Sequence, residues 1–281
     1  MKNNNCFQIR RLLFTLFIGL SLLFLTITVN SQSVSKSDTT ISKIDRIKTA
    51  GKLVMGTSPD YPPYEFHLLN DQEGDIVGVD IDIAKEIAKE LGVKLEIKNI
   101  VFHKLFDVLN SDEVDLVIAG LAPSERRRKL VDFSDIYYQA IQNMLIRAED
   151  AEKIVYLRDL RGKVVGTQKG SIQQDMAQKQ IIGAEFQMKD TINELIEDLK
   201  SKKIDAAILE KPVAESFVMR NKDLMNIECH SGAYDALLGS AIAVKKGNNE
   251  FLKEINRILQ ELKEKDKIRE FVEDAKILMN K

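Results

Sequence analysis

The sequence predicts an α/β protein built from two similar lobes. From Lys52 onward, short apolar segments of strand composition alternate with amphipathic helical segments in the order βαβαβ. The same order then begins again, because GKLVMGT at 51–57 is echoed by GKVVGT at 162–167, and NSDEVDLVIAG at 110–120 by KSKKIDAAILE at 200–210. We therefore expect each lobe to hold a mostly parallel sheet flanked by helices.

The first repeat contains a long helix between its first two strands. Asp80 is a candidate N-cap for this helix, and Gly92 is a candidate stop signal. The predicted apolar stripe of the helix consists of Ile83, Ala84, Ile87, Ala88 and Leu91. The other elements of this repeat are predicted strands at 53–55, 93–97 and 114–119 and a predicted helix at 103–110.

The last part of the chain, residues 249–280, predicts two packed helices. A coiled coil would need heptads sustained over more turns. Between the lobes, residues 137–147 are apolar and strand-like, which predicts a stiff crossing segment. The two apolar stripes of the C-terminal helices consist of Phe251, Ile255, Ile258, Leu259 and Leu262, and of Ile268, Phe271, Val272 and Ala275.

The N-terminal residues 1–31 have the pattern of an export signal. Basic residues precede an apolar run at 12–29, and cleavage after Ser31 is predicted. The run is about as long as the shortest membrane spans, so an uncleaved anchor is the alternative. Residues 32–42 are small and polar and predict a linker. In both cases we expect the body of the protein outside the cytoplasm.

Composition and motifs exclude several function classes. The net charge of −2 gives no nucleic-acid footprint. Cys6 precedes the apolar run, so the signal has no lipoprotein cysteine after it, and Cys229 alone remains for the mature chain. The three histidines, His67, His103 and His230, lack metal-ligand spacing. We therefore expect no metal site, no cofactor and no catalytic residue.

Four loops follow the carboxyl ends of predicted strands, where ligands bind in open α/β sheets. They are residues 57–66, 119–127, 167–173 and 209–212. Two loops belong to each lobe, so a cleft between the lobes would be lined by all four.

The second of these loops contains three consecutive arginines at 126–128. Ser124 is a candidate N-cap, which places Arg127 at the third helical position. Positive charge at a helix N-terminus is unfavourable. Successive helical residues point about 100° apart, so at most one arginine can face the cleft. We predict that one of the three arginines binds a carboxylate, whose geometry matches a guanidinium, and that the other two lie on a solvated face.

The other three loops carry weaker signals. Gly170-Ser171 opens a helix whose free N–H groups would bind an anion. Tyr61 and Tyr64 flank two prolines and predict a rigid aromatic platform, with ordinary edge packing as the alternative. Glu210 ends a buried strand and could bind an ammonium group, with a helix N-cap role as the alternative.

Five motifs in this chain resemble those of the extracytoplasmic solute-binding proteins of polar amino acid ABC importers. They are GTSPDYPPYEF, VGVDIDIAKEIAKELG, VDLVIAGLAPSERRRKLVDFSDIYY, GTQKGSIQ and DAAILEKPVA. The resemblance implies a type II periplasmic-binding-protein fold, in which two crossing segments join the lobes. Lobe 1 would hold residues 43–139 and 239–281, and lobe 2 residues 140–238.

The resemblance also implies roles for individual residues. Arg127 should bind the α-carboxylate of a free amino acid, and Glu210 the α-ammonium. Tyr61 and Phe102 should sandwich the ligand side chain. The family often has a hydroxyl at the position of Ala122, and usually an aspartate at the position of Glu210. The complete predicted site is Arg127, Glu210, Tyr61, Phe102, Ser58, Asp60, Glu65, Ala119, Gly120, Ala122, Gln168, Gly170, Ser171 and Gln173.

The function that follows is an extracytoplasmic receptor, expected to be a monomer, that delivers an amino acid to an ABC permease. Oxygen acceptors at Ser58, Asp60 and Glu65, together with the aromatic pair, favour arginine or another basic amino acid. Lys169 would suit an acidic side chain, so glutamine, glutamate or another polar ligand stays open. Two remote alternatives are an anchored sensor module and a small-acid dehydratase, for which His103 and Glu210 would be the acid–base candidates.

Overall fold

The computed structural model describes residues 41–68, 74–228 and 238–279. The predicted export signal and residues 32–40 of the predicted linker lie outside these ranges, as do Cys6, Cys229 and His230. Within the described ranges, no helix combines the length and the apolar character needed to cross a membrane.

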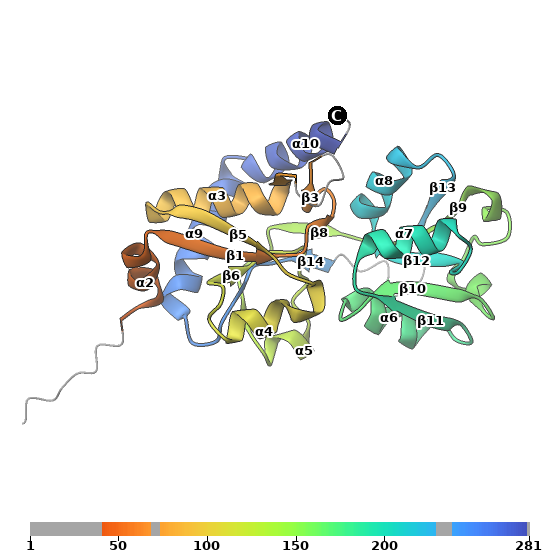
Figure 1. Cartoon of the computed structure of the whole chain (residues 1–281), viewed down its shortest axis with the longest axis horizontal. Coiled ribbons are helices and arrows are strands. Elements are labelled where there is room, and N and C mark those ends of the chain that lie inside the picture. The colour runs from red at the N-terminus through yellow and green to blue at the C-terminus, as the bar shows by residue number, and fades with distance from the viewer. Residues whose placement is uncertain (1–40, 69–73, 229–237, 280–281) are drawn as a thin grey trace, which may run out of the picture. The chain divides into compact units, whose positions relative to one another are not determined.

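The first five-stranded sheet, called the first sheet below, contains the strands of the first sequence repeat (Figure 1). In spatial order its strands are β5 (Lys94–Asn99), β1 (Lys52–Thr57), β6 (Leu116–Val117), β15 (Ala243–Val244) and β7 (Asp132–Phe133). β1 pairs in parallel with β5 and β6, whereas β15 pairs antiparallel with β6 and β7. Its helices are α2 (Lys43–Ala50), α3 (Val79–Leu91), α4 (Leu105–Asn110), α9 (Asn249–Glu264) and α10 (Lys267–Met279).

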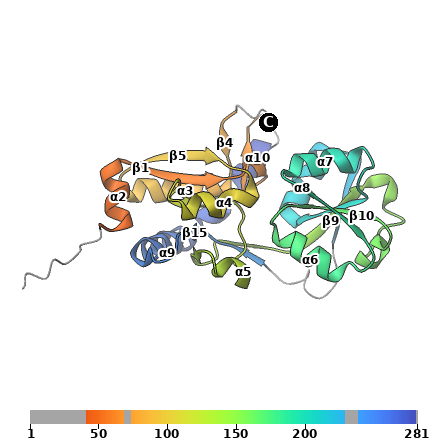
Figure 2. The ribbon, with the colours of Figure 1, turned by 60° about the horizontal axis from the view of Figure 1, so that its bottom comes forward.

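The second sheet contains the strands of the second repeat and has the same pattern of neighbours. In spatial order its strands are β11 (Glu185–Lys189), β10 (Val164–Gln168), β12 (Ala206–Glu210), β9 (Gln142–Arg147) and β13 (Leu224–Glu228). Its helices are α6 (Ile172–Gln180), α7 (Ile192–Lys200) and α8 (Lys211–Arg220). α7 and α8 cover one face of this sheet and α6 covers the other (Figures 1 and 2).

Smaller elements connect the two sheets. β8 (Tyr138–Ala140) precedes β9 in the chain, and β14 (Leu238–Ser240) precedes β15. β8 and β14 pair antiparallel with each other. The chain therefore passes between the sheets twice. The remaining elements are β2 (Asp60–Tyr61), β3 (Glu65–His67), β4 (Ile76–Val77), α5 (Glu125–Arg128) and 3₁₀ turns at Phe102–Lys104, Ala148–Asp150 and Leu157–Leu160.

The repeated sequence segments occupy equivalent positions in the two sheets. The backbone N–H of Val54 donates to Asp115 Oδ2 at 2.8 Å, and the N–H of Asp115 donates back to the Val54 carbonyl at 2.7 Å. Val164 and Asp205 repeat this exchange at 2.9 and 2.7 Å. In both repeats the aspartate fixes the register of the last parallel strand against the first. The two sequence repeats therefore form similar structural units, as predicted.

The predicted α/β class is confirmed, and the sheets are mixed in strand direction. The βαβαβ repeats supply the parallel pairs, as expected. Strands β7, β9, β13 and β15, which follow or join the repeats, pair antiparallel. The predicted C-terminal helices are also confirmed, and all five residues of the first stripe are buried in α9.

The predicted N-cap of α3 is wrong. The helix begins at Val79 with Gly78 before it, and Asp80 is the second helical residue and fully buried. Gly78 has a φ of 126°, and a Cβ atom there would lie 2.3 Å from the carbonyl oxygen of Tyr64. Only glycine fits at the position before the helix. Asp80 therefore belongs to the first helical turn, and its side chain is buried in the protein interior.

Candidate functional site

Arg127 is the one inward-facing residue of the arginine run. Ser124 caps α5, and its Oγ accepts a hydrogen bond from the Arg127 N–H at 3.3 Å. Arg127 is 3% exposed, whereas Arg126 and Arg128 are exposed to solvent. The prediction that one arginine points inward and two lie on a solvated face is confirmed.

The buried guanidinium of Arg127 contacts neutral groups. Nη1 donates to the Ala122 carbonyl at 3.0 Å and Nη2 to the Gly170 carbonyl at 3.3 Å. The ring centroid of Phe102 lies 5.5 Å from its Cζ. Within the described part of the chain, Arg127 forms no ion pair. Burial, and secondly the charge of Arg126, lower the pKa of Arg127 to about 10.

A small cavity lies against Arg127 and gathers half of the predicted site. The first sheet contributes one wall through the segments after β1, β5 and β6, and the second sheet contributes the other through β10 and the start of α6. Ile172, the first residue of α6, also lines it and was not predicted. The predicted residues that line the cavity are Tyr61, Phe102, Ala119, Gly120, Arg127, Gln168 and Gln173.

Tyr61 and Tyr64 pack against each other, and of the two only Tyr61 lines the cavity. The rings of Tyr61 and Tyr64 stack with centroids 5.6 Å apart and an interplanar angle of 19°. Gly120 has a φ of 53°, and a Cβ atom there would lie 3.1 Å from the Tyr61 ring. The glycine thus lets the aromatic ring pack directly on the loop that carries Arg127.

Glu210 is the buried acid of the second sheet. It is 2% exposed, and its Oε2 accepts a hydrogen bond from the Tyr64 hydroxyl at 2.6 Å. Glu210 occupies the N-cap position of α8, as the alternative interpretation expected, although its side chain makes no capping hydrogen bond. Burial raises the pKa of Glu210 from 4.5 to about 8, the charge of Asp80 adds to this rise, and the Tyr64 hydrogen bond and Arg127 oppose it.

The loop at residues 60–64 makes hydrogen bonds to helices of the second sheet. Asp60 accepts from the N–H of Ile192, the first residue of α7, at 2.6 Å. Ser216 Oγ of α8 lies 3.3 Å from the Pro62 carbonyl oxygen. Asp60 therefore contacts the start of a helix, and neither it nor Ser58 lines the cavity. Burial raises the pKa of Asp60 to about 7, although the Ile192 N–H and Ser58 oppose this rise.

Two carboxyl groups are buried together beneath this loop. Glu65 and Asp80 are both fully buried, and their carboxyl groups interact with each other. Burial raises the pKa of Glu65 well above its ordinary value, and the neighbouring Asp80 raises it further. Burial also raises the pKa of Asp80 to about 6, opposed by hydrogen bonds from Gly120, Tyr137 and Glu65. Sequence reasoning missed Asp80 because its position near a helix start suggested a cap.

The predicted anion site at the start of α6 stays a prediction, and two N–H groups directly before the helix form hydrogen bonds within the protein. The N–H of Gly170 donates to Gln174 Oε1 at 2.8 Å, and the N–H of Ser171 donates to the Gln168 carbonyl at 3.1 Å. Ser171 instead caps α6, accepting from the Gln174 N–H. The Gly170 carbonyl oxygen of this turn accepts a hydrogen bond from Arg127 Nη2.

The glutamines of this region form a polar network. Gln173 Nε2 donates to Gln142 Oε1 at 2.8 Å and lies 3.4 Å from the Tyr61 hydroxyl. Gln168 Nε2 lies 3.3 Å from the carbonyl oxygen of Asp190. Both side chains are buried and present amide groups toward the cavity.

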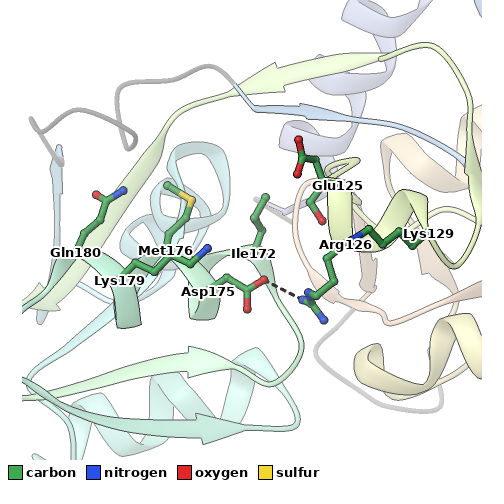
Figure 3. Close-up of a pocket in the computed structure, with 9 residues that line it drawn as sticks. Glu125, Arg126, Lys129, Ile172, Asp175, Met176, Lys179 and Gln180 are labelled. Atoms are coloured by element: carbon green, nitrogen blue, oxygen red, sulfur yellow. Dashed lines mark hydrogen bonds and ion pairs between the residues drawn. The ribbon is translucent and has the colours of Figure 1, made fainter.

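A second, more open pocket lies between α5 and α6 (Figure 3). Arg126 reaches across it to Asp175, with 3.0 Å between Nη2 and Oδ2. Its lining also includes the exposed Lys129 and Lys179 and the half-buried Met176. Among the described residues, no cluster of His, Cys, Asp or Glu side chains could hold a metal ion.

Comparison with known proteins places this chain in a family. Residues 53–274 match the model of the bacterial extracellular solute-binding proteins, family 3. The arginine-binding extracellular protein ArtP of Bacillus subtilis is 39% identical over 216 residues, which are 76% of this chain and 81% of that protein. The glutamine-binding protein GlnH of Bacillus subtilis is 32% identical over 234 residues, 82% of this chain and 81% of that protein.

A solved structure agrees with this result. AbpA of Streptococcus pneumoniae, an amino acid ABC transporter substrate-binding protein bound to L-arginine, superimposes with a TM-score of 0.80. It shares 36% sequence identity, and the match covers 84% of this chain and 98% of that one. Family model, relatives and fold agree, and this chain belongs to the bacterial extracellular solute-binding proteins, family 3.

Proposed function

We propose that the protein binds one free L-amino acid between the loops of its two sheets and delivers it to the permease of an ABC importer. One observation carries the proposal. Arg127 and Glu210 are both buried, and neither forms an ion pair within the described residues. The charge of each group also affects the pKa of the other. An amino acid zwitterion would supply a carboxylate to the one and an ammonium to the other, which offsets the cost of burying them.

The ligand that we infer is L-arginine or a closely related basic amino acid. A flat guanidinium would stack between Tyr61 and Phe102, both of which line the cavity. Lys169, which would favour an acidic side chain, does not line the cavity, is 54% exposed and lies 3.9 Å from Asp190. ArtP is named as an arginine-binding protein, and the structure of AbpA contains bound L-arginine. Both relatives support the same inference.

The remaining predicted contacts belong to this proposal. Backbone groups of Ala119, Gly120, Ala122, Gly170 and Ser171 would surround the main chain of the ligand. Gln168 and Gln173 would face its side chain through their amides. Ser58, Asp60 and Glu65 would act through the loop that positions Tyr61.

Ligand capture would be accompanied by closure of two lobes. We assign residues 43–139 and 239–281 to lobe 1 and residues 140–238 to lobe 2, with the crossing segments as the hinge. A ligand shifts such an equilibrium by binding the closed form more tightly than the open form. The hydrogen bonds from residues 60–64 to α7 and α8 would form in the closed state.

We propose that the protein performs no reaction on its ligand and acts outside the cytoplasm as a monomer. A dehydratase of this fold would need a positioned acid or base. His103 pairs with Asp190, with 3.3 Å between Nδ1 and Oδ1, and does not line the cavity. Mass spectrometry of the N-terminus of the exported protein would distinguish cleavage after Ser31 from an anchored form.

The experiment that tests the ligand is a thermal-shift screen with the twenty amino acids. L-Arginine should raise the melting temperature most, because only a ligand that binds the folded state stabilises it. Stabilisation by glutamine or glutamate without stabilisation by arginine would end the arginine proposal. Recovery of chemically altered ligand after long incubation would end the proposal of a receptor without chemistry.

A further inference from the structure

We propose that Asp80 is a positioning residue of the ligand site, which holds the loop at residues 119–124, called the Arg127 loop because it leads to Arg127, in register with Tyr137, the residue directly before the crossing strand β8. This inference rests on the proposed function, since it concerns the same site. Asp80 lies on α3, outside all four loops that the sequence assigned to the cleft. Its two carboxylate oxygens nevertheless contact two separate segments of the site.

Each oxygen of Asp80 accepts one hydrogen bond. Oδ2 accepts from the backbone N–H of Gly120 at 2.8 Å, and Oδ1 accepts from the hydroxyl of Tyr137 at 2.7 Å. Asp80 and Tyr137 are both almost completely buried. Hydrogen bonds to an ionised acceptor are stronger than those between neutral groups, and they are stronger still in the protein interior, where water is excluded.

The carboxylate is itself held in place by the backbone. The N–H of Asp80 donates to the Tyr64 carbonyl at 2.9 Å, and the N–H of Val79 donates to the Pro63 carbonyl at 3.1 Å. Gly78 permits this approach, because any side chain there would overlap the Tyr64 carbonyl. The start of α3 is therefore fixed to the aromatic loop, and Asp80 extends that connection to the Arg127 loop and to Tyr137, directly before β8.

The position of Gly120 determines the geometry of the cavity. Ala119 and Gly120 line it, and the Tyr61 ring packs against Gly120. Two residues later in the same loop, the Ala122 carbonyl accepts from Arg127 Nη1. A loop that loses its hydrogen bond to Asp80 would lose the fixed relation between the arginine and the aromatic platform. Ligand binding would then have to order the loop, and the free energy needed for this would weaken the affinity.

The test compares Asp80→Asn with Asp82→Asn in the full mature chain. Asp82 is in the first turn of the same helix, is partly exposed and pairs with Lys85 at 2.8 Å, so its variant removes the same charge without touching the loop. Affinity for L-arginine is measured by calorimetry. Hydrogen exchange is followed by mass spectrometry for peptides that cover residues 119–124 and 137–140. Tyr137→Phe, which removes one donor only, is the second variant.

Asp80→Asn should weaken arginine binding by about tenfold or more, the scale of one hydrogen bond to a charged group. Exchange should rise in the peptides at 119–124 and 137–140 and stay unchanged in α9 and in the second sheet. Tyr137→Phe should change the same peptides with a smaller loss of affinity, and Asp82→Asn should match the wild type.

Two results would overturn the assignment. One is wild-type affinity in a folded Asp80→Asn protein. The other is faster exchange throughout the first sheet, which would show a general structural role. If the wild type itself bound no amino acid, the proposed function would fail, while the exchange data would still report whether Asp80 holds the loop.

Discussion

At the scale of single residues, the proposed site depends on buried titratable groups that have no ion-pair partner among the described residues. The cap at Ser124 and the helical geometry predicted that one of the three arginines points inward, and the family resemblance selected Arg127, which is the buried one. Glu210 was also identified, from its place at the end of a buried strand. Asp80 was missed, because which oxygen accepts from which distant N–H depends on the tertiary packing of Gly120 and Tyr137.

The ionisation of Glu210 should couple ligand binding to proton release. Burial and the charge of Asp80 raise its pKa to about 8 in the ligand-free protein, so it is protonated at neutral pH. An ammonium group beside it would favour the ionised form and lower this pKa. Binding should therefore release a proton, and affinity for arginine should rise as the pH increases from 6 to 8.

Calorimetry in buffers of different ionisation enthalpy measures the number of protons released. In Glu210→Gln the component of the release that comes from this residue should disappear. A wild-type protein that binds arginine with the same affinity at pH 6 and pH 8 would show that Glu210 does not change its ionisation.

At the scale of elements, the pattern of the sequence predicted the strands and helices of the repeats and both C-terminal helices. The short helix α2 was not predicted, and the start of α3 was placed wrongly. The sequence also predicted more parallel pairing than exists. Strands of two or three residues, such as β7 and β15, have too little periodicity to be recognised, and long-range pairing determines their direction.

The beginning of α3 should be far less tolerant of substitution than its end. Gly78→Ala places a Cβ atom 2.3 Å from the Tyr64 carbonyl oxygen at a φ of 126°. We expect a loss of more than about 3 kcal/mol in the free energy of unfolding, above the usual cost of backbone strain alone. Denaturant unfolding measures this loss.

Gly92→Ala is the matched control at the other end of the helix. Gly92 has a φ of 72°, and no atom lies within 4 Å of the position of its Cβ. In Gly92→Ala only the left-handed backbone conformation should lower the free energy of unfolding, by about 1–2 kcal/mol. Equal losses in the two variants would contradict the argument that the close approach at Tyr64 requires Gly78.

At the scale of the whole molecule, the buried carboxyl groups should make stability depend on pH. Burial raises the pKa of Glu210 to about 8, of Asp60 to about 7 and of Asp80 to about 6. In each case the folded protein holds a proton that the unfolded chain has released above pH 5. The free energy of unfolding should therefore fall as the pH rises from 5.5 to 8.5.

Thermal unfolding of the ligand-free protein at these two pH values measures the effect. The melting temperature should be lower at pH 8.5, and Glu210→Gln should reduce the difference because it removes the group with the highest of the three pKa values. A melting temperature that rises between pH 5.5 and 8.5 would contradict the assignment of these groups as protonated in the folded state.

The most direct test of the central claim is a calorimetric titration of L-arginine into the wild type, Arg127→Ala and Arg126→Ala. The wild type should bind one arginine per chain. Arg127→Ala should lose at least about 2 kcal/mol of binding free energy, since the ligand carboxylate would be buried without its partner. Arg126→Ala should stay close to the wild type, because its exposed ion pair with Asp175 contributes little. Unchanged affinity in Arg127→Ala would contradict the account.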